Sequence, residues 1–178
     1  MRQDERKWGK GLLAGMVGGL IGTMVMTEFQ KGWTSASKNF ANNGAGEKRR
    51  KDHKTQTDTE KEDATMKAAG KIAALTGHRL SHQQKKRAGP LVHYGFGTLQ
   101  GAMYGTVTEL AGVSGGFVPS LIFGAALFTI ADEIAVPALG LSGEPSESRL
   151  SSHLYGLAAH VVYGLSTEMA RRGFRAAI

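Results

Sequence analysis

Four long apolar runs, each with at most two charged residues, alternate with charged segments along this chain. They cover about residues 11–28, 90–110, 117–141 and 153–170. Each run is too long, and too rich in Ala, Gly and Leu, for a β-strand. None has the regular polar face of a helix on the surface of a soluble protein. Since about 20 apolar residues cross a bilayer, the pattern predicts an all-α integral membrane bundle of four transmembrane helices, with a long polar loop between helices 1 and 2.

The first run follows a basic N-terminal segment, residues 1–10, which is also how a cleaved signal peptide begins. No small-x-small cleavage site follows the run. It ends instead in Met-Thr-Glu-Phe-Gln-Lys. We therefore predict a retained transmembrane helix over residues 11–28.

Residues 29–87 form the predicted basic loop. The stretch 31–63 has few large apolar side chains and holds a Lys-Arg-Arg-Lys cluster at 48–51, so it is expected to be flexible. Over 64–80, apolar residues recur at helical spacing and predict a weak amphipathic helix. Two placements fit this helix, on the membrane surface or on the surface of an ordinary loop.

The composition limits which ligands and partner molecules are expected. The chain has 25 Gly, no Cys and a net charge of +7. Without cysteine there is neither a disulfide framework nor a thiolate site. The basic residues flank apolar runs, so anionic lipid headgroups are a simpler partner than nucleic acid. We predict no cofactor and no nucleic-acid partner.

Glycines spaced three and four residues apart predict close helix packing, because a face without side chains lets another helix approach. The expected packing positions are Gly11, Gly15, Gly18 and Gly22 in the first run, and Gly156 and Gly164 in the last. Such faces favour association with a second copy or with other membrane-protein subunits.

The direction of each predicted helix determines on which side of the membrane its ionisable residues lie. Antiparallel neighbours bring one set to the same side of the membrane, with His160 deeper: Glu28, His93, Asp132, Glu133, His153 and His160. Histidines and carboxylates in this setting can relay protons or bind a divalent metal. The alternative is that the residues at helix ends, Glu28, Glu109 and Glu168 among them, simply meet headgroup water, with Lys31 or Arg171 as a charged partner.

Two stretches carry a resemblance to a known family. Tyr104-Gly-Thr-Val-Thr-Glu109 is echoed by Tyr163-Gly-Leu-Ser-Thr-Glu168, which continues to Arg171-Arg172 and Arg175. With His93 sixteen positions before Glu109 and Pro137-Ala-Leu-Gly-Leu-Ser142, this pattern resembles the YagU-like family of small bacterial inner-membrane proteins over about residues 88–176. The resemblance implies a polytopic helical membrane protein and implies no biochemical activity.

Function is predicted only as a class. No Gly-x-Ser-x-Gly, phosphate-binding loop or His-Glu-x-x-His occurs, so no enzyme is predicted. The first hypothesis is a structural or accessory membrane protein that packs through its glycine faces. The second is a transporter or a proton- or metal-responsive protein. Arg171, Arg172 and Arg175 favour a cytoplasmic C-terminus, and with it a cytoplasmic N-terminus.

Overall fold

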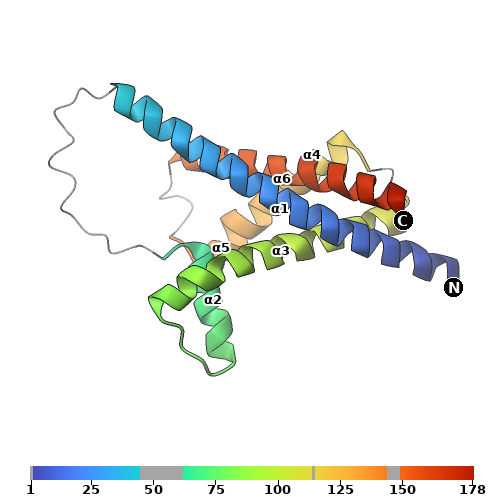
Figure 1. The fold of residues 1–178 in the computed structure, drawn as a ribbon, viewed down its shortest axis with the longest axis horizontal. Helices are drawn as coiled ribbons and strands as arrows, with labels where there is room; N and C mark the ends of the chain where they lie inside the picture. Colours follow the sequence, from blue (N-terminus) through green and yellow to red (C-terminus); the bar gives the residue numbers. More distant parts are fainter. Residues whose placement is uncertain (1, 45–61, 114, 144–148) are drawn as a thin grey trace.

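The computed structural model describes residues 2–44, 62–113, 115–143 and 149–178, and these residues form helices without a strand (Figure 1). The all-α class is therefore confirmed. In chain order the elements are α1 (Arg2–Gly44), α2 (Ala64–Leu75), α3 (His82–Leu110), α4 (Phe117–Leu127), the π-helix η2 (Phe128–Ala135), α5 (Val136–Ala138) and α6 (Leu150–Ala177).

The long helices pack antiparallel to their neighbours. Along the interface between α1 and α3, Gly11 lies against Gly105 and Gly19 against Gly97, so the two helices run in opposite directions. Gly22 of α1 likewise lies against Thr167 of α6, and Gly18 lies one turn further along, against Arg171. Consequently α3 and α6 run the same way, and α1 runs against both, as the sequence predicted.

Glycines make these close approaches possible. Helix α1 has two such faces: Gly11, Gly15 and Gly19 face α3, while Gly18 and Gly22 face α6. A Cβ atom at any of them would overlap the neighbouring helix, so the backbones lie nearly in contact. In α6, Gly156 packs on the Phe128 ring and Gly164 on the backbone of α4. All six predicted packing glycines are thus covered within this chain.

Helix α1 is longer than the sequence indicated. The predicted end lay at residue 28, and the predicted flexible stretch began at 31, whereas α1 continues to Gly44. The Trp33 ring packs at a tilt against both Phe29 and Tyr155, each at 5.8 Å between ring centres. The Thr34 hydroxyl donates a hydrogen bond to the carbonyl oxygen of Gln30, one turn earlier in the helix. The basic cluster at 48–51 lies outside the described residues.

The second apolar run belongs to a helix that begins earlier than predicted. Ser81 caps the start of α3 by accepting a hydrogen bond from the Gln84 amide, and the Gln84 side chain accepts one from the Ser81 amide. Pro90 therefore lies inside the helix rather than at its start. The predicted helix over 64–80 is shorter, since α2 ends at Leu75 and Gly77 turns the chain with φ +77°.

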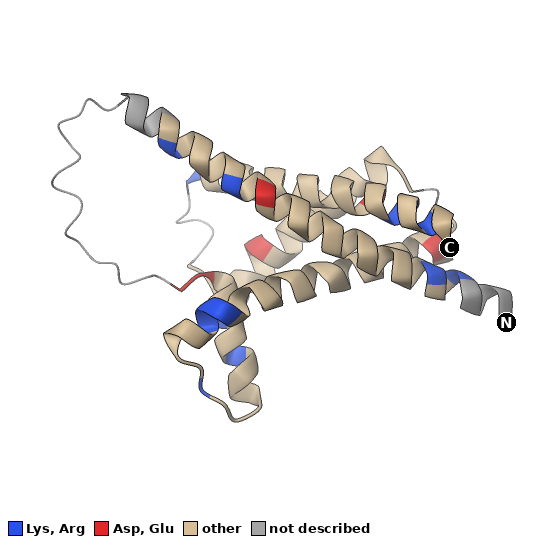
Figure 2. Cartoon of the chain, viewed as in Figure 1, with Lys and Arg blue, Asp and Glu red and all other residues tan. Residues whose placement is uncertain are grey.

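The outer surface of the bundle is apolar. Two segments, Lys7–Asn39 and Phe117–Ala138, are long and apolar enough to cross a membrane, with mean hydropathies of 1.6 and 1.7. Only 39% and 17% of their most apolar windows are buried, so most of these side chains face outward. On α3 an outward stripe consists of Phe96, Leu99, Met103, Val107 and Leu110. Charged residues gather near the ends of the bundle and on α2 (Figure 2).

Candidate functional site: a carboxylate and imidazole pocket

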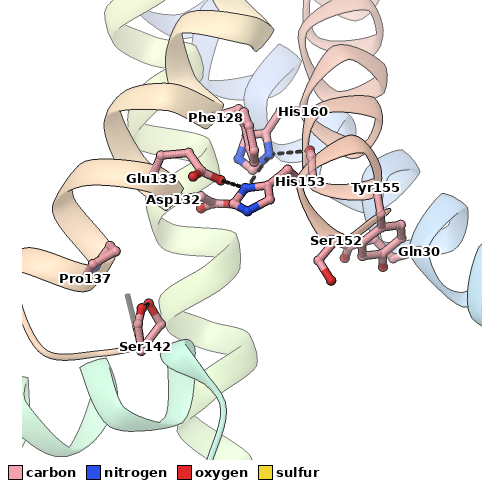
Figure 3. Close-up of a pocket in the computed structure, with 12 residues that line it drawn as sticks. Gln30, Phe128, Asp132, Glu133, Pro137, Ser142, Ser152, His153, Tyr155 and His160 are labelled. Atoms are coloured by element: carbon pink, nitrogen blue, oxygen red, sulfur yellow. Dashed lines mark hydrogen bonds and ion pairs between the residues drawn. The ribbon is translucent and has the colours of Figure 1, made fainter. Parts of the chain in front are cut away.

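An open pocket of about 270 Å³ lies between η2, the first turns of α6 and the middle of α1. Eight of the twelve residues that line it have polar side chains, and Figure 3 shows two carboxylates and two imidazoles gathered on one side of it. It is lined by Gln30, Phe128, Asp132, Glu133, Pro137, Ser142, Gly143, Ser152, His153, Tyr155, Gly156 and His160.

The first acid–imidazole pair joins η2 to the start of α6. Glu133 Oε1 lies 2.8 Å from His153 Nδ1, which is hydrogen-bond distance. Both side chains are about a quarter exposed, at 25% and 27%, so this pair meets water from the pocket while it bridges two helices. A proton on His153 would make the contact an ion pair.

The second pair lies deeper along the same helix. His160 Nδ1 lies 3.7 Å from Asp132 Oδ2 and 3.0 Å from the carbonyl oxygen of Gly156. A carbonyl only accepts hydrogen bonds, so Nδ1 carries the proton in this arrangement. His160 itself is buried, and the Phe128 ring lies 5.7 Å from it between ring centres. The mid-helix histidine thus has partners on its own helix and on η2.

The π-helix explains how adjacent acids serve one pocket. The sequence predicted an ordinary helix here, on which Asp132 and Glu133 could not share a face. In η2 the Val136 amide donates instead to the carbonyl of Ala131, five residues back. This wider turn changes the direction of each side chain, and both acids line the pocket (Figure 3). The only signal in the sequence was Pro137, which has no N–H to continue the helical ladder.

Two predicted members of the set take other positions. Glu28 lies on the exposed face of α1 and pairs with Lys31 at 2.7 Å, so it does not line the pocket. His93 also lies outside the pocket lining, on α3, with its ring edge-on to Tyr94. Its Nε2 atom is buried and has no hydrogen-bond partner in the described part of the chain.

Metal binding was one of the two chemistries predicted for these residues. Among the residues that the structure describes, no three His, Cys, Asp or Glu side chains come together as a metal site. The observed arrangement is instead two separate acid–imidazole pairs, each suited to holding a proton.

A second ionic cluster lies at the opposite end of the bundle. Arg171 binds Glu168 through two hydrogen bonds of 2.7 and 3.0 Å, and Arg175 binds Glu109 at 2.7 Å. Arg171 also lies 3.8 Å from Glu109, which joins the two pairs. Glu168 and Arg171 are 3% and 4% exposed, so the expectation that Glu168 meets headgroup water is wrong, while its expected pairing with Arg171 is confirmed. The Glu168–Arg171 spacing of three was the local signal for this pair.

Aromatic rings fill the space between the two polar regions. Tyr104 stacks on Phe123 with ring centres 4.4 Å apart, and Tyr163 tilts against Phe123 at 5.8 Å. The Tyr163 hydroxyl donates to the carbonyl of Gly97 at 2.6 Å, which ties α6 to α3. The tyrosines of the two echoed hexapeptides therefore both pack on Phe123.

Helix α2 is attached to α3 by charge as well as by packing. Lys85 binds the Glu62 carboxylate at 2.9 Å, and His82 lies 3.5 Å from it. The hydrogen bond from Lys85 is the main reason that the pKa of Glu62 is lowered. Met66 and Ala69 of α2 are buried beside the first turns of α3.

Comparison of the chain with family models, curated proteins and solved structures finds no match. The YagU-like resemblance therefore stays a prediction based on the residues that carry it.

Proposed function

We propose that this is an integral membrane protein that binds and releases protons at the pocket between η2 and α6. The observation that carries the proposal is the paired geometry of Glu133 with His153 and Asp132 with His160. These pairs lie inside a helical bundle whose outer surface is apolar.

The membrane placement rests on exposed apolar surface and on length. A soluble protein would bury its most apolar helix, yet Phe117–Ala138 has only 17% of its apolar window buried. From His153 to Arg175, α6 rises about 33 Å, close to the thickness of bilayer hydrocarbon. Helices α3 and α6 would be the other two spans, and their Gly, Thr, His and Tyr residues lower the mean hydropathy.

We further propose that α2 lies among anionic lipid headgroups. It projects from the side of the bundle, across the direction of α3 (Figure 1), and its Leu75 side chain is 88% exposed. Basic residues surround this apolar tip and the adjoining start of α3: Lys67, Lys71, Arg79, Lys85, Lys86 and Arg87. Exposed apolar side chains beside lysine and arginine match the interface of an anionic bilayer.

Proton binding is the chemistry that the pocket geometry favours. Histidine changes charge between about pH 5 and pH 8, and a neighbouring carboxylate favours its charged form. Protonation of His153 or His160 would therefore strengthen its contact with Glu133 or Asp132, while deprotonation would loosen the link between η2 and α6. The pocket opens to solvent, which gives protons an entry.

The accessory hypothesis has lost its main argument, because the glycines on which it depended pack within the chain. Association with a second copy or with another membrane protein stays a prediction. So does location in the bacterial inner membrane with both termini in the cytoplasm, which a reporter fused to the C-terminus would test.

The test of proton binding is histidine NMR in lipid bilayers. Protein labelled with ¹⁵N at histidine is recorded from about pH 5 to pH 8, the range in which imidazoles change charge. We expect His153 and His160 to change protonation state in this range, and we expect Glu133→Gln and Asp132→Asn to move the transition of the partner histidine only. Imidazole signals that keep one protonation state throughout would contradict the proposal.

The chain provides an internal control. His78 lies on the exposed turn after α2, where it contacts the Thr76 hydroxyl at 3.3 Å. The pH dependence of the His78 NMR signal should be the same in wild type, Glu133→Gln and Asp132→Asn. A shift of the His78 signal in either variant would indicate a general structural change rather than the loss of one carboxylate.

A further inference from the structure

Buried polar side chains recur along the inward face of α6, beside the buried Ala159 and Gly164. Beyond the pocket histidines, the helix turns Tyr163, Thr167 and Arg171 into the bundle, and each of these is buried. They follow His160 at spacings of three, four and four, which places them on one face of the helix.

Three buried polar atoms beside this face have no hydrogen-bond partner among the described residues: His93 Nε2, Tyr104 Oη and Thr167 Oγ1. Buried polar atoms in proteins are almost always bonded to protein or to ordered water. His93 belongs to the same end of α3 as the pocket, and Tyr104 lies one to two turns before Glu109 at the other end. The unpartnered atoms therefore occur along the bundle interior, between its two ionic regions.

From this placement we propose that the inward face of α6 carries protons through the bundle, between the Asp132–His160 pair and the Glu168–Arg171 pair. The proposal rests on the proposed function, because it takes the pocket as the entry. His160 and Arg171 are separated by roughly 16 Å of helix rise. The Tyr163 and Thr167 hydroxyls divide that distance into shorter steps, which ordered water can bridge.

The chemistry is a transfer of protons without oxidation or covalent change. One proton enters at Asp132 or His160, and one leaves at Glu168 or Glu109. Hydroxyl groups and water can accept a hydrogen bond on one side while they donate on the other, so each passes a proton without holding a charge. Arg171 does not present an isolated positive charge to that proton, because Glu168 and Glu109 both contact it.

The charged and titratable groups around this face come from η2, α6 and α3. At the entry, Asp132 and Glu133 come from η2 and His153 and His160 come from α6, while His93 of α3 lies outside the pocket lining. At the exit, Glu109 comes from α3, while Glu168, Arg171 and Arg175 come from α6. Helix α1 presents glycines to this region, namely Gly18 and Gly22. The stacked rings of Tyr104, Phe123 and Tyr163 lie between the two ends.

The experiment measures proton entry into liposomes that contain the purified protein and a trapped pH dye, with a potassium diffusion potential as the driving force. Wild-type vesicles should acidify several-fold faster than empty vesicles. Thr167→Val removes the hydroxyl at constant shape, and should lower the rate at least several-fold. Thr167→Ser restores a hydroxyl and should return the rate close to wild type.

Matched variants separate the path from general damage. Thr129→Val makes the same change on the exposed side of η2, where the hydroxyl bonds only its own helix, and should leave the rate unchanged. Tyr163→Phe should slow entry as Thr167→Val does. Equal rates in wild type, Thr167→Val and Tyr163→Phe would overturn the proposed path.

The two proposals fail differently. If wild-type vesicles acidify no faster than empty ones while His153 and His160 still titrate by NMR, proton binding stands and the path through the bundle is wrong. If the pocket histidines do not titrate, the proposed function fails first, and any proton entry would need another route.

Discussion

Gly19 of α1 and Gly101 of α3 meet backbone to backbone, with no side chain between them. A Cβ atom built on Gly101 would lie within 2.6 Å of the Gly19 amide nitrogen, a distance that real Cβ atoms do not reach. The contact lies between the Gly11–Gly105 and Thr23–Gly97 contacts of the α1–α3 interface. The absence of side chains at Gly19 and Gly101 therefore sets the distance between the two helices at this contact.

Gly101→Ala should destabilise the fold by about 1–3 kcal/mol, because the added methyl group forces the helices apart. Gly95 is the matched control on the same helix, since nothing lies within 4 Å of a Cβ at that position. Gly95→Ala should be neutral or stabilising by up to about 1 kcal/mol, from helix propensity. Unfolding in detergent measures both, and equal effects would show that α1 and α3 are not in close contact.

The glycine interface illustrates what the sequence could predict. Spacings of three and four within α1 are local information, and they identified Gly11, Gly15, Gly18 and Gly22 correctly as packing positions. The partner glycines of α3, namely Gly97, Gly101 and Gly105, have the same spacing of four. They could have been found in the same way.

The polar clusters show what the sequence could not predict. The contact between Glu109 and Arg175 joins residues 66 positions apart, and depends on the register of α3 against α6. No local pattern encodes that register. The shared pocket of Asp132 and Glu133 depends likewise on the π-helical turn, which is rare enough that an ordinary helix is the better expectation from sequence. Helix direction, by contrast, was enough to place the acids near His153.

The membrane placement can be tested with spin labels, because the chain has no native cysteine. Met103 lies on the outward face of α3, with 55% of its side chain exposed. A spin label attached to the cysteine of Met103→Cys should collide with dissolved oxygen far more often than with a water-soluble nickel complex. A label that the nickel complex reaches freely would contradict a membrane-spanning α3.

The position of α2 needs a label of its own. A spin label on Leu75→Cys should lie at headgroup depth in vesicles that contain anionic lipid. In purely zwitterionic vesicles it should lie further out in the water, because the basic residues around α2 supply part of the attraction to the membrane. The Met103→Cys label in the same vesicles is the control and should not change. If Leu75→Cys is equally aqueous in both lipids, α2 does not dock on the membrane.

Attachment of α2 to α3 should weaken in acid. The pKa of Glu62 is lowered in the folded protein, chiefly by its hydrogen bond with Lys85, so the contact is fully present above the pKa of the unfolded chain. It is lost as the pH falls through the lower, folded-state pKa. Hydrogen exchange of the α2 amides, corrected for the intrinsic effect of pH, should therefore speed up in that window.

Lys85→Met is the control for this acid effect, because it removes the main cause of the lowered pKa while keeping a long side chain. Exchange in α2 should then be faster than in wild type at neutral pH, and should depend less on pH in the acid range. An unchanged acid effect in Lys85→Met would mean that another group, such as His82, controls the attachment.

Two ion pairs of identical spacing lie in different surroundings, one buried and one exposed. Glu168 and Arg171 lie three residues apart and are almost fully buried, with side chains 4% and 5% exposed. Glu28 and Lys31 have the same spacing, but their side chains are 71% and 65% exposed. Arg171→Met should cost about 3–5 kcal/mol, because it leaves Glu168 charged, buried and uncompensated. Lys31→Met should cost at most about 1 kcal/mol.

Unfolding in detergent measures both changes, and the double variant Glu168→Gln with Arg171→Met identifies the cause. Once neither charge remains, the double variant should recover a large part of the stability that Arg171→Met loses, because the penalty comes from the unpaired carboxylate rather than from the missing contact. A double variant as unstable as Arg171→Met would mean instead that the guanidinium is needed for its own packing, against the Tyr104 ring.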